Sequence, residues 1–292
     1  MHKTIFSGAC TALVTPMKDG KIDYKSLDRL IEFQIEKGIP AIVISGTTGE
    51  SATLSYKEHK SLIAHSVKRA QNRVKIIAGT GSNDTAKAIK MSKYACGCGA
   101  DALLVVSPYY NKANKEGLIL HYEAIADESE RPIIIYNVPT RTCVNLTGDI
   151  YRKLSKHKNI CGIKEASSDI SSAAQTINTC PLPLYSGNDD LLIPILSLGG
   201  AGVISVMSNI FPEISQSICT LYKNGKHSDA LELYMKYLNF SKLLFSDVNP
   251  ILIKTVMAHA KLCSDEMRLP LVKGNKAKIK AVIDEYEKLK RQ

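Results

Sequence analysis

Short apolar runs recur along the first two thirds of the chain, and most are rich in Val, Ile and Leu without intervening polar residues. Strands of a parallel sheet that are buried on both faces have this composition, whereas half-exposed strands alternate apolar and polar residues. The pattern therefore predicts eight parallel strands: Ala9–Val14, Ala41–Ile44, Val74–Ala78, Ala102–Val106, Pro132–Tyr136, Ile160–Lys164, Leu184–Ser186 and Gly202–Ser205.

Segments with helical spacing of apolar residues lie between these runs. Ser55–Gln71 begins with a serine followed three residues later by Glu58, which is the arrangement of a capping box. The other expected helices are Tyr24–Lys37, Asp84–Ala95, Lys115–Asp127, Thr147–Lys156 and Ile170–Asn178. Alternation of strands and helices up to an eighth strand predicts a (β/α)8 barrel, with a doubly wound sheet as the alternative.

The strand pattern stops after Ser208. Three helical segments follow without strands between them, at His227–Phe245, Pro250–Lys261 and Lys273–Arg291. We therefore expect a catalytic barrel over residues 1–225 and a C-terminal helical extension over residues 226–292, packed on the barrel or on a partner chain.

Polar residues follow almost every predicted strand. In a (β/α)8 barrel these carboxyl ends meet at one mouth, which is where active sites of this fold lie. The predicted mouth therefore gathers hydroxyls, a phenol and an amine, whereas the amino ends of the predicted strands carry no such set. This difference between the two ends of the barrel indicates an enzyme. The segments concerned are Gly46–Glu50, Gly79–Asn83, Ser107–Asn111, Tyr136–Pro139, Lys164–Glu165, Ser186–Asp189 and Ser205.

Lys164 differs from most of the other lysines because it closes a buried strand, whereas most of the others lie on predicted helices and loops, where we expect solvated charges. Partial desolvation favours the neutral amine, which can attack a carbonyl group and form a Schiff base. The alternative is an ion pair with a barrel carboxylate such as Glu165 or Glu50. Position alone favours neither interpretation.

Tyr136, Thr47 and Thr48 in the predicted mouth can each be interpreted either as part of the reaction or as a purely structural residue. Tyr136 ends the preceding strand, so its phenol could move protons beside Lys164, or it could be a core tyrosine with a bonded hydroxyl. Thr47 and Thr48 stand in a glycine-flanked turn, where their hydroxyls and backbone N–H groups could hold a carboxylate, or serve only the turn.

Composition narrows the class of protein. The 45% of hydrophobic and 23% of charged residues exclude a disordered chain. No apolar run is long enough for a membrane helix, and the N-terminus lacks the apolar core of a signal peptide. Eight scattered cysteines without a CxxC predict reduced thiols in a cytoplasmic protein and no zinc site. The chain has no HExxH, GxGxxG or GxxxxGK[ST] motif, which counts against a zinc protease, a Rossmann dehydrogenase and a P-loop NTPase.

The net charge of +10 raises the alternative of a nucleic-acid or anionic-surface binder. Residues 273–292 hold seven Lys or Arg against three acidic residues, interleaved with apolar positions as in an amphipathic helix. No aromatic-rich strip or nucleic-acid motif accompanies these charges. We therefore expect neither a nucleic-acid partner nor a membrane partner.

The polar segments together resemble one family, the pyruvate-dependent class I aldolases and lyases, and within them the dihydrodipicolinate synthase family. The resemblance spans essentially the whole chain. It rests on Gly46–Ser51, Tyr109–Asn111, Tyr136–Thr142, Gly162–Glu165, Ser186–Asp189, Gly202–Ser205 and Asn249–Pro250. N-acetylneuraminate lyases usually have Ser at the Thr47 position and lack the Arg141 equivalent, so the presence of both Thr47 and Arg141 favours the dihydrodipicolinate synthase family. A related aldolase acting on a sugar acid remains the competing interpretation.

The resemblance implies a lyase that condenses pyruvate with L-aspartate 4-semialdehyde to 4-hydroxy-tetrahydrodipicolinate, in lysine biosynthesis through diaminopimelate. It implies a pyruvate imine on Lys164 and no metal or organic cofactor. It further implies a homotetramer built as a dimer of tight dimers. The implied catalytic residues are Lys164, Tyr136, Thr47 and Tyr110, with Tyr110 reaching a neighbouring subunit, and the implied substrate-binding residues are Thr48, Arg141, Ile204 and Gly187.

Many members of the family bind L-lysine as a feedback inhibitor at the dimer interface. In the lysine-sensitive pattern the Tyr56 position is His and the Lys87 position is Glu, so a negative charge that would attract the ligand is replaced here by a positive one. We therefore expect weak or absent inhibition by lysine. The positions implied for this site are Ser51, Ala52, Tyr56, His59, Asn83, Lys87 and Tyr109.

Overall fold

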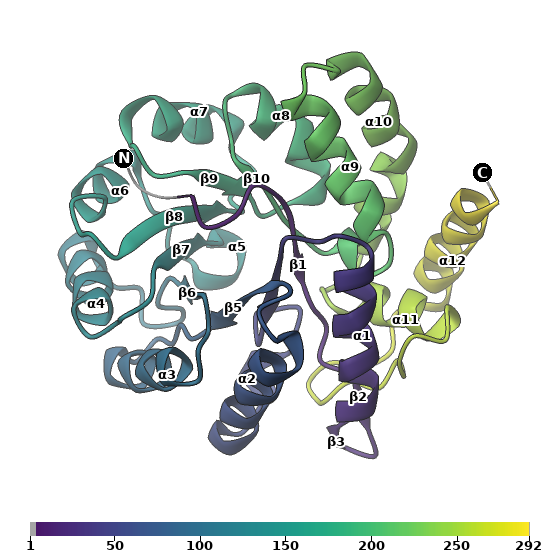
Figure 1. The fold of residues 1–292 in the computed structure, drawn as a ribbon, viewed down its shortest axis with the longest axis horizontal. Coiled ribbons are helices and arrows are strands. Elements are labelled where there is room, and N and C mark those ends of the chain that lie inside the picture. The colour runs from purple at the N-terminus through teal and green to yellow at the C-terminus, as the bar shows by residue number, and fades with distance from the viewer. Residues whose placement is uncertain (1–3, 292) are drawn as a thin grey trace.

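The structure is a computed structural model that describes residues 4–291, so the outermost ends of the two predicted regions, residues 1–3 and 292, lie outside it. Eight strands of the described chain close into a barrel in which every neighbouring pair is parallel (Figure 1). This confirms the (β/α)8 barrel over the doubly wound sheet. The strands are β1 (Gly8–Ala12), β4 (Ala41–Ile44), β5 (Lys75–Gly79), β6 (Ala102–Val106), β7 (Ile133–Asn137), β8 (Ile160–Glu165), β9 (Leu184–Ser186) and β10 (Gly202–Ser205).

Helices cover the outside of the barrel between successive strands (Figure 1). The predicted capping box at the start of α2 is present, because Ser55 accepts a hydrogen bond from the Glu58 backbone N–H and the Glu58 carboxylate accepts one from Ser55. The helices are α1 (Tyr24–Glu36), α2 (Tyr56–Ala70), α3 (Thr85–Gly97), α4 (Lys115–Asp127), α6 (Gly148–Leu154), α7 (Ile170–Thr179), α8 (Leu192–Ser197) and α9 (Pro212–Lys223).

Several elements were not predicted from the sequence. Helix α9 has no polar N-cap, because the side chain of its cap residue Phe211 accepts no backbone hydrogen bond, but Pro212 stands in its first turn, where proline is favoured. Helix α8 has only six residues, too few to show a clear period. The other additions are short: a hairpin of β2 (Met17–Lys18) and β3 (Lys21–Ile22), helix α5 (Pro139–Thr142), and the 3-10 turns η1 (Ser51–Thr53), η2 (Asp189–Leu191) and η3 (Met207–Asn209).

The barrel interior is closed at the amino ends of the strands. Phe6, which precedes β1, stacks on the ring of Tyr185 with the ring centroids 4.2 Å apart. The Tyr185 hydroxyl donates a hydrogen bond of 2.7 Å to the Phe6 carbonyl oxygen. Ile5 packs in the same apolar cluster. The opposite end of the barrel, at the carboxyl-terminal ends of the strands, is therefore the one where we look for a substrate site.

Three helices of the C-terminal extension, α10 (His227–Leu244), α11 (Ile251–His259) and α12 (Lys276–Lys290), lie together on one side of the barrel, next to α9 (Figure 1). Their bounds agree with the predicted segments to within three residues at each end. Phe240, Leu252 and Val282 belong to the same apolar cluster that joins the barrel to its helices. The extension is thus packed into the main core of the chain.

All eight cysteines are free, and five of them are buried. No helix of residues 4–291 is long and apolar enough to span a membrane. Within the same residues, no cluster of three or more His, Cys, Asp or Glu side chains is arranged to hold a metal ion.

Candidate active site

Lys164 and Tyr136 are neighbours at the carboxyl end of the barrel. They are register partners on the adjacent parallel strands β8 and β7, so their side chains emerge on the same face of the sheet. The Lys164 Nζ atom lies 4.3 Å from the centre of the Tyr136 ring. Both side chains are 6% exposed. The Tyr136 ring therefore lies beside the amine, as the strand order allowed, and its part in proton transfer stays a prediction.

Neither of the carboxylates proposed as ion-pair partners reaches Lys164. Glu165 accepts hydrogen bonds from the Asn137 amide at 3.0 and 3.1 Å and from the Tyr151 hydroxyl at 3.0 Å. Burial, together with the adjacent Glu165 charge, raises the pKa of the Tyr151 phenol well above its ordinary value. Glu50 pairs with a different lysine, Lys254. Within residues 4–291 no carboxylate pairs with Lys164, and this removes the alternative that the sequence left open.

Several small or apolar residues lie near Lys164 in the barrel, among them Gly187 and Cys10. Cys10 of β1 is buried inside the barrel, and this burial raises the pKa of its thiol well above the ordinary value, while the positive charge of Lys164 acts in the opposite sense. Ile204 of β10 is the register partner of Cys10 and is fully buried.

Gly187 gives Lys164 room. A Cβ atom at this position would lie 2.6 Å from the Ala166 Cβ atom and 3.2 Å from the Lys164 Cε atom. The first distance is too short for any side chain without movement of the chain. The residue predicted as substrate-binding therefore lies directly against the lysine, and a glycine is required there for packing.

The turn that carries Thr47 and Thr48 is bracketed by two residues in the left-handed conformation, Ser45 with φ 58° and Glu50 with φ 56°. Such residues cost roughly 1–2 kcal/mol each and persist where surrounding contacts fix them. Thr48 is buried, and its Oγ1 atom accepts a hydrogen bond of 3.0 Å from the Asn249 side-chain amide. Asn249 comes from the C-terminal extension, so two distant parts of the chain meet at this threonine.

A cavity of about 630 Å³ opens beside this turn. Thr47, Arg141 and Asn249 line it, and so do all seven positions implied for lysine binding: Ser51, Ala52, Tyr56, His59, Asn83, Lys87 and Tyr109. Lys164, Tyr136, Thr48, Ile204 and Gly187 are not among its lining residues and lie in or next to the barrel interior. The structure thus divides the predicted residues into a buried group around Lys164 and an open group around Thr47 and Arg141.

Arg141 lies on the short helix α5, directly after the Tyr136 strand. Its Nη2 atom donates a hydrogen bond of 3.2 Å to the Asn249 carbonyl oxygen. The rest of the guanidinium is exposed on the cavity side and can bind a carboxylate through two parallel hydrogen bonds.

Tyr110 is not brought to Thr47 within one chain. Its side chain is 89% exposed, its backbone is left-handed with φ 73°, and it does not line the cavity. A tyrosine this exposed is available to a second molecule.

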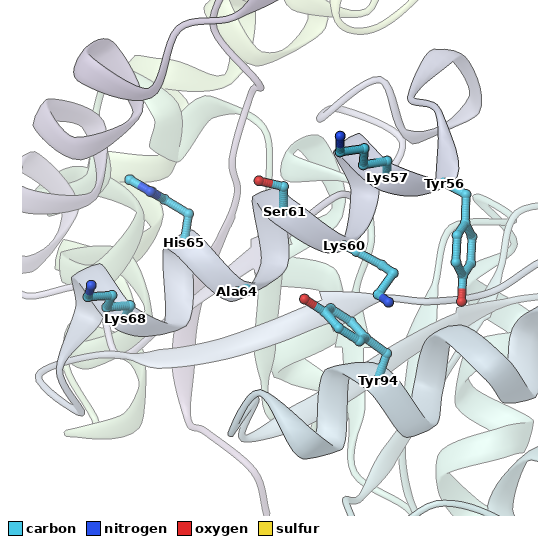
Figure 2. Close-up of a pocket in the computed structure, with 8 residues that line it drawn as sticks. All are labelled: Tyr56, Lys57, Lys60, Ser61, Ala64, His65, Lys68 and Tyr94. Carbon is cyan, nitrogen blue, oxygen red and sulfur yellow. The ribbon is translucent and has the colours of Figure 1, made fainter.

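A second hollow, of about 550 Å³, lies on helices α2 and α3 (Figure 2). Lysine side chains line it, and Figure 2 shows the amine of Lys60 between the rings of Tyr56 and Tyr94, 4.1 Å from the centre of the Tyr94 ring. Tyr56 is the one residue it shares with the predicted site. Because it lacks every residue of the barrel mouth, we do not assign the reaction to it.

Sequence reasoning missed two residues near the mouth. Asn249 had been matched as part of a motif without a role, and Lys254 was expected to be a solvated charge. Lys254 is instead fully buried, so that expectation was wrong. Its position in the apolar run Ile251–Met257 is the signal that could have found it.

Comparisons with known proteins agree with this architecture. The model of the dihydrodipicolinate synthetase family matches residues 5–288. The 4-hydroxy-tetrahydrodipicolinate synthase of Clostridium novyi is 43% identical over 294 residues, which cover 99% of each chain. The structure of the same enzyme from Methylacidiphilum fumariolicum SolV superposes with a TM-score of 0.97 at 40% identity, covering 98% of this chain and 96% of that one.

A further similar structure is dihydrodipicolinate synthase of Cyanidioschyzon merolae with lysine bound. Its TM-score is 0.96 at 34% identity, and the match covers 99% of this chain and all of that one. Sequence and fold agree over nearly the full length, and the chain belongs to the dihydrodipicolinate synthetase family.

Proposed function

We propose that this protein condenses pyruvate with L-aspartate 4-semialdehyde to form 4-hydroxy-tetrahydrodipicolinate, in the diaminopimelate route to lysine. The observation that carries the proposal is the environment of the Lys164 amine. Its amine is buried at the mouth of the barrel, has no carboxylate partner in residues 4–291, and lies over a phenol ring. Membership of the dihydrodipicolinate synthetase family supports the choice of substrates.

The reaction begins at the Lys164 amine, which attacks the keto carbon of pyruvate. The keto oxygen leaves as water and an imine remains. Loss of a methyl proton converts the imine to an enamine, whose carbon then attacks the aldehyde carbon of the second substrate. The aldehyde oxygen becomes the product hydroxyl group. The amino group of the second substrate displaces Lys164 and closes the ring, which frees the enzyme.

Binding of pyruvate is assigned to the buried group of residues. Thr48 and the adjacent backbone N–H groups hold its carboxylate, with the main chain at Ile204 and Gly187 completing the site. The closeness of Gly187 to the Lys164 Cε atom supports this arrangement, because a pyruvate bound to the Lys164 amine would lie near Gly187.

Proton transfer is assigned to Tyr136, with Thr47 linking it to Tyr110. The short distance between the Tyr136 ring and the Lys164 amine supports proton transfer by Tyr136. The exposure of Tyr110 supports a relay completed by a second chain, which makes a tight dimer the active unit and a homotetramer of two such dimers the expected assembly.

Arg141 is assigned to the carboxylate of L-aspartate 4-semialdehyde. Its exposed guanidinium lines the cavity, and the hydrogen bond to the Asn249 carbonyl oxygen fixes one of its nitrogen atoms. A planar, bidentate donor suits a carboxylate better than it suits the neutral hydroxyls of a sugar acid.

The proposed reaction uses no metal and no organic cofactor, since the imine on Lys164 supplies the electron sink. We place the protein in the cytoplasm, in keeping with its eight free cysteines. We also retain the division into a catalytic barrel, 1–225, and an extension, 226–292, whose boundary falls in the turn between α9 and α10.

Feedback by L-lysine is proposed to be weak or absent. Lys87 lines the cavity that holds all seven implied positions, and the amines of Lys60 and Lys90 lie 5.7 and 5.4 Å from the Tyr56 ring. A cationic ligand would meet positive charge there. Titration of the initial rate with L-lysine checks this, and half-inhibition at sub-millimolar lysine would contradict it.

The test of the proposed function is turnover by the purified protein. We expect pyruvate consumption to require L-aspartate 4-semialdehyde, no cleavage of N-acetylneuraminate, and no activity in the Lys164→Ala variant. Cleavage of N-acetylneuraminate without turnover of the semialdehyde would assign the protein to sugar-acid chemistry instead.

A further inference from the structure

Lys254 is the second buried lysine at this end of the molecule. It lies on helix α11 between apolar side chains and has no exposed surface. Burial of an ammonium group is strongly unfavourable unless charge and hydrogen bonding are both compensated. Its partners therefore indicate what the charge does.

All three N–H groups of Lys254 have an oxygen acceptor. The Nζ atom lies 2.5 Å from Glu50 Oε1, 3.0 Å from the Thr15 carbonyl oxygen and 2.5 Å from the Glu266 carbonyl oxygen. An amine that donates three hydrogen bonds has no lone pair for attack on a carbonyl, so Lys254 is not a second nucleophile.

The partners of Lys254 adjoin the turn that carries the two threonines. Glu50 is the last residue of that turn, and its other oxygen accepts the backbone N–H of Arg268 at 3.1 Å. Thr15, whose carbonyl oxygen binds Lys254, donates its hydroxyl to the Gly49 carbonyl oxygen at 2.6 Å. One ammonium group thus fixes the segment after β1 and the segment after β4 to the C-terminal extension.

Helix α11 contacts the same turn at its start as well. Asn249, which stands just before the helix, donates to the Thr48 hydroxyl. A displacement of α11 would therefore move both Thr48 and Glu50, which lie on either side of Gly49.

We infer that Lys254 is a positioning residue for substrate binding: through Glu50 it fixes the turn that presents Thr48 to pyruvate. The inference rests on the proposed function, because it specifies how the extension shapes the pyruvate subsite. It predicts a particular kinetic signature. Loss of the pair weakens binding of pyruvate while Lys164 remains the residue that reacts.

The test measures the pyruvate concentration that gives half-maximal labelling when borohydride reduces the imine on Lys164. The variants are Glu50→Gln, which removes only the charge, and Glu50→Gln with Lys254→Met, which removes both charges and leaves no buried ion unpaired. The matched control is Val256→Ala, which opens a cavity in the same helix and leaves the Lys254–Glu50 pair in place. Thermal unfolding of each protein shows whether it is folded.

We expect half-maximal labelling to need about tenfold more pyruvate in the double variant, and a smaller increase in Glu50→Gln. The reason is that displacement of the turn moves Thr48 out of hydrogen-bonding position for the pyruvate carboxylate. We expect maximal labelling to stay on Lys164 and Val256→Ala to label like the original protein. If the double variant does not fold, Glu50→Gln decides alone.

Unchanged half-saturation in a folded variant would overturn the inference, and so would an equal shift in Val256→Ala, which would indicate general destabilisation. Absence of any adduct on Lys164 in the original protein would instead refute the proposed function, so the two failures are distinguishable.

Discussion

Two buried lysines stand at the same end of this barrel in opposite surroundings. Lys164 is 6% exposed and Lys254 is fully buried. Lys254 donates to three oxygen atoms, one of them a carboxylate, whereas Lys164 has no carboxylate partner within residues 4–291 and lies over the Tyr136 ring. Burial alone therefore does not distinguish the two lysines, whereas the hydrogen-bond acceptors around each amine do.

The two surroundings suit different tasks. A fully bonded ammonium group is fixed in place and joins segments of chain, as Lys254 does between the extension and the threonine turn. An amine that no carboxylate pairs with in residues 4–291, such as that of Lys164, is the one that we propose attacks the carbonyl group. Each of the following predictions changes one side of this comparison.

The largest expected effect is at the phenol beside Lys164. In Tyr136→Phe the ring remains over the amine but the proton donor is lost, so we expect kcat to fall by about 10²- to 10³-fold, in the range of lost general acid–base catalysis. Steady-state kinetics measure this, and borohydride labelling of Lys164 checks that imine formation survives. A kcat within about threefold of the original would contradict the role of the phenol.

A smaller effect is expected from crowding Lys164. In Gly187→Ala the new Cβ atom would meet Ala166 and the Lys164 Cε atom, so we expect kcat/KM for pyruvate to fall by about tenfold through displacement of the amine. Gly97→Ala is the matched control, because an added Cβ atom there has no neighbour within 4 Å. Equal activity of the two variants would show that the close contact at Gly187 has no bearing on the reaction.

The smallest effect concerns the loop that supports Lys254. Arg268, whose backbone binds Glu50, also pairs with Glu58, and one of the two contacts measures 2.9 Å. Hydrogen bonding to the Arg268 guanidinium lowers the pKa of Glu58 to about 2. A lowered pKa means that the pair stabilises the fold above the ordinary pKa of about 4.5 and loses this contribution as the pH falls toward 2.

We therefore expect Glu58→Gln to reduce the free energy of unfolding by about 1 kcal/mol at pH 7, a modest value because both side chains are partly exposed. The difference from the original protein shrinks below pH 4.5. Glutamine can still cap α2, so the variant isolates the charge. Urea unfolding at pH 7, 5 and 3.5 tests this, and a difference that does not vary with pH would be inconsistent with the ion pair.

The barrel strands could be predicted because a strand buried on both faces leaves a continuous apolar run, as at Ala102–Val106. Two helices were missed for different reasons. Helix α8 is shorter than two helical turns, so its period cannot be recognised, and packing against the barrel stabilises it. Helix α9 lacks a polar cap but has Pro212 in its first turn and buried residues at helical spacing, Ser215, Ile218 and Cys219, and these signals could have identified it.

The site was partly predictable for the same reason. Tyr136 and Lys164 end consecutive strands, and the register of these strands places them side by side. The order of the apolar runs in the sequence is enough to predict such a pairing. Contacts between segments about 200 residues apart carry no such signal, and the pairing of Asn249 with Thr48 and of Lys254 with Glu50 is of this kind. The roles of individual residues came from family resemblance and stay predictions.

The most direct measurement is the position of the covalent adduct. The protein is incubated with pyruvate, reduced with borohydride, digested, and the peptides carrying Lys164 and Lys254 are compared by mass spectrometry. We predict the pyruvate-derived mass on Lys164, none on Lys254, and none in Lys164→Ala. An adduct on Lys254, or labelling that persists in Lys164→Ala, would contradict the distinction between the two lysines.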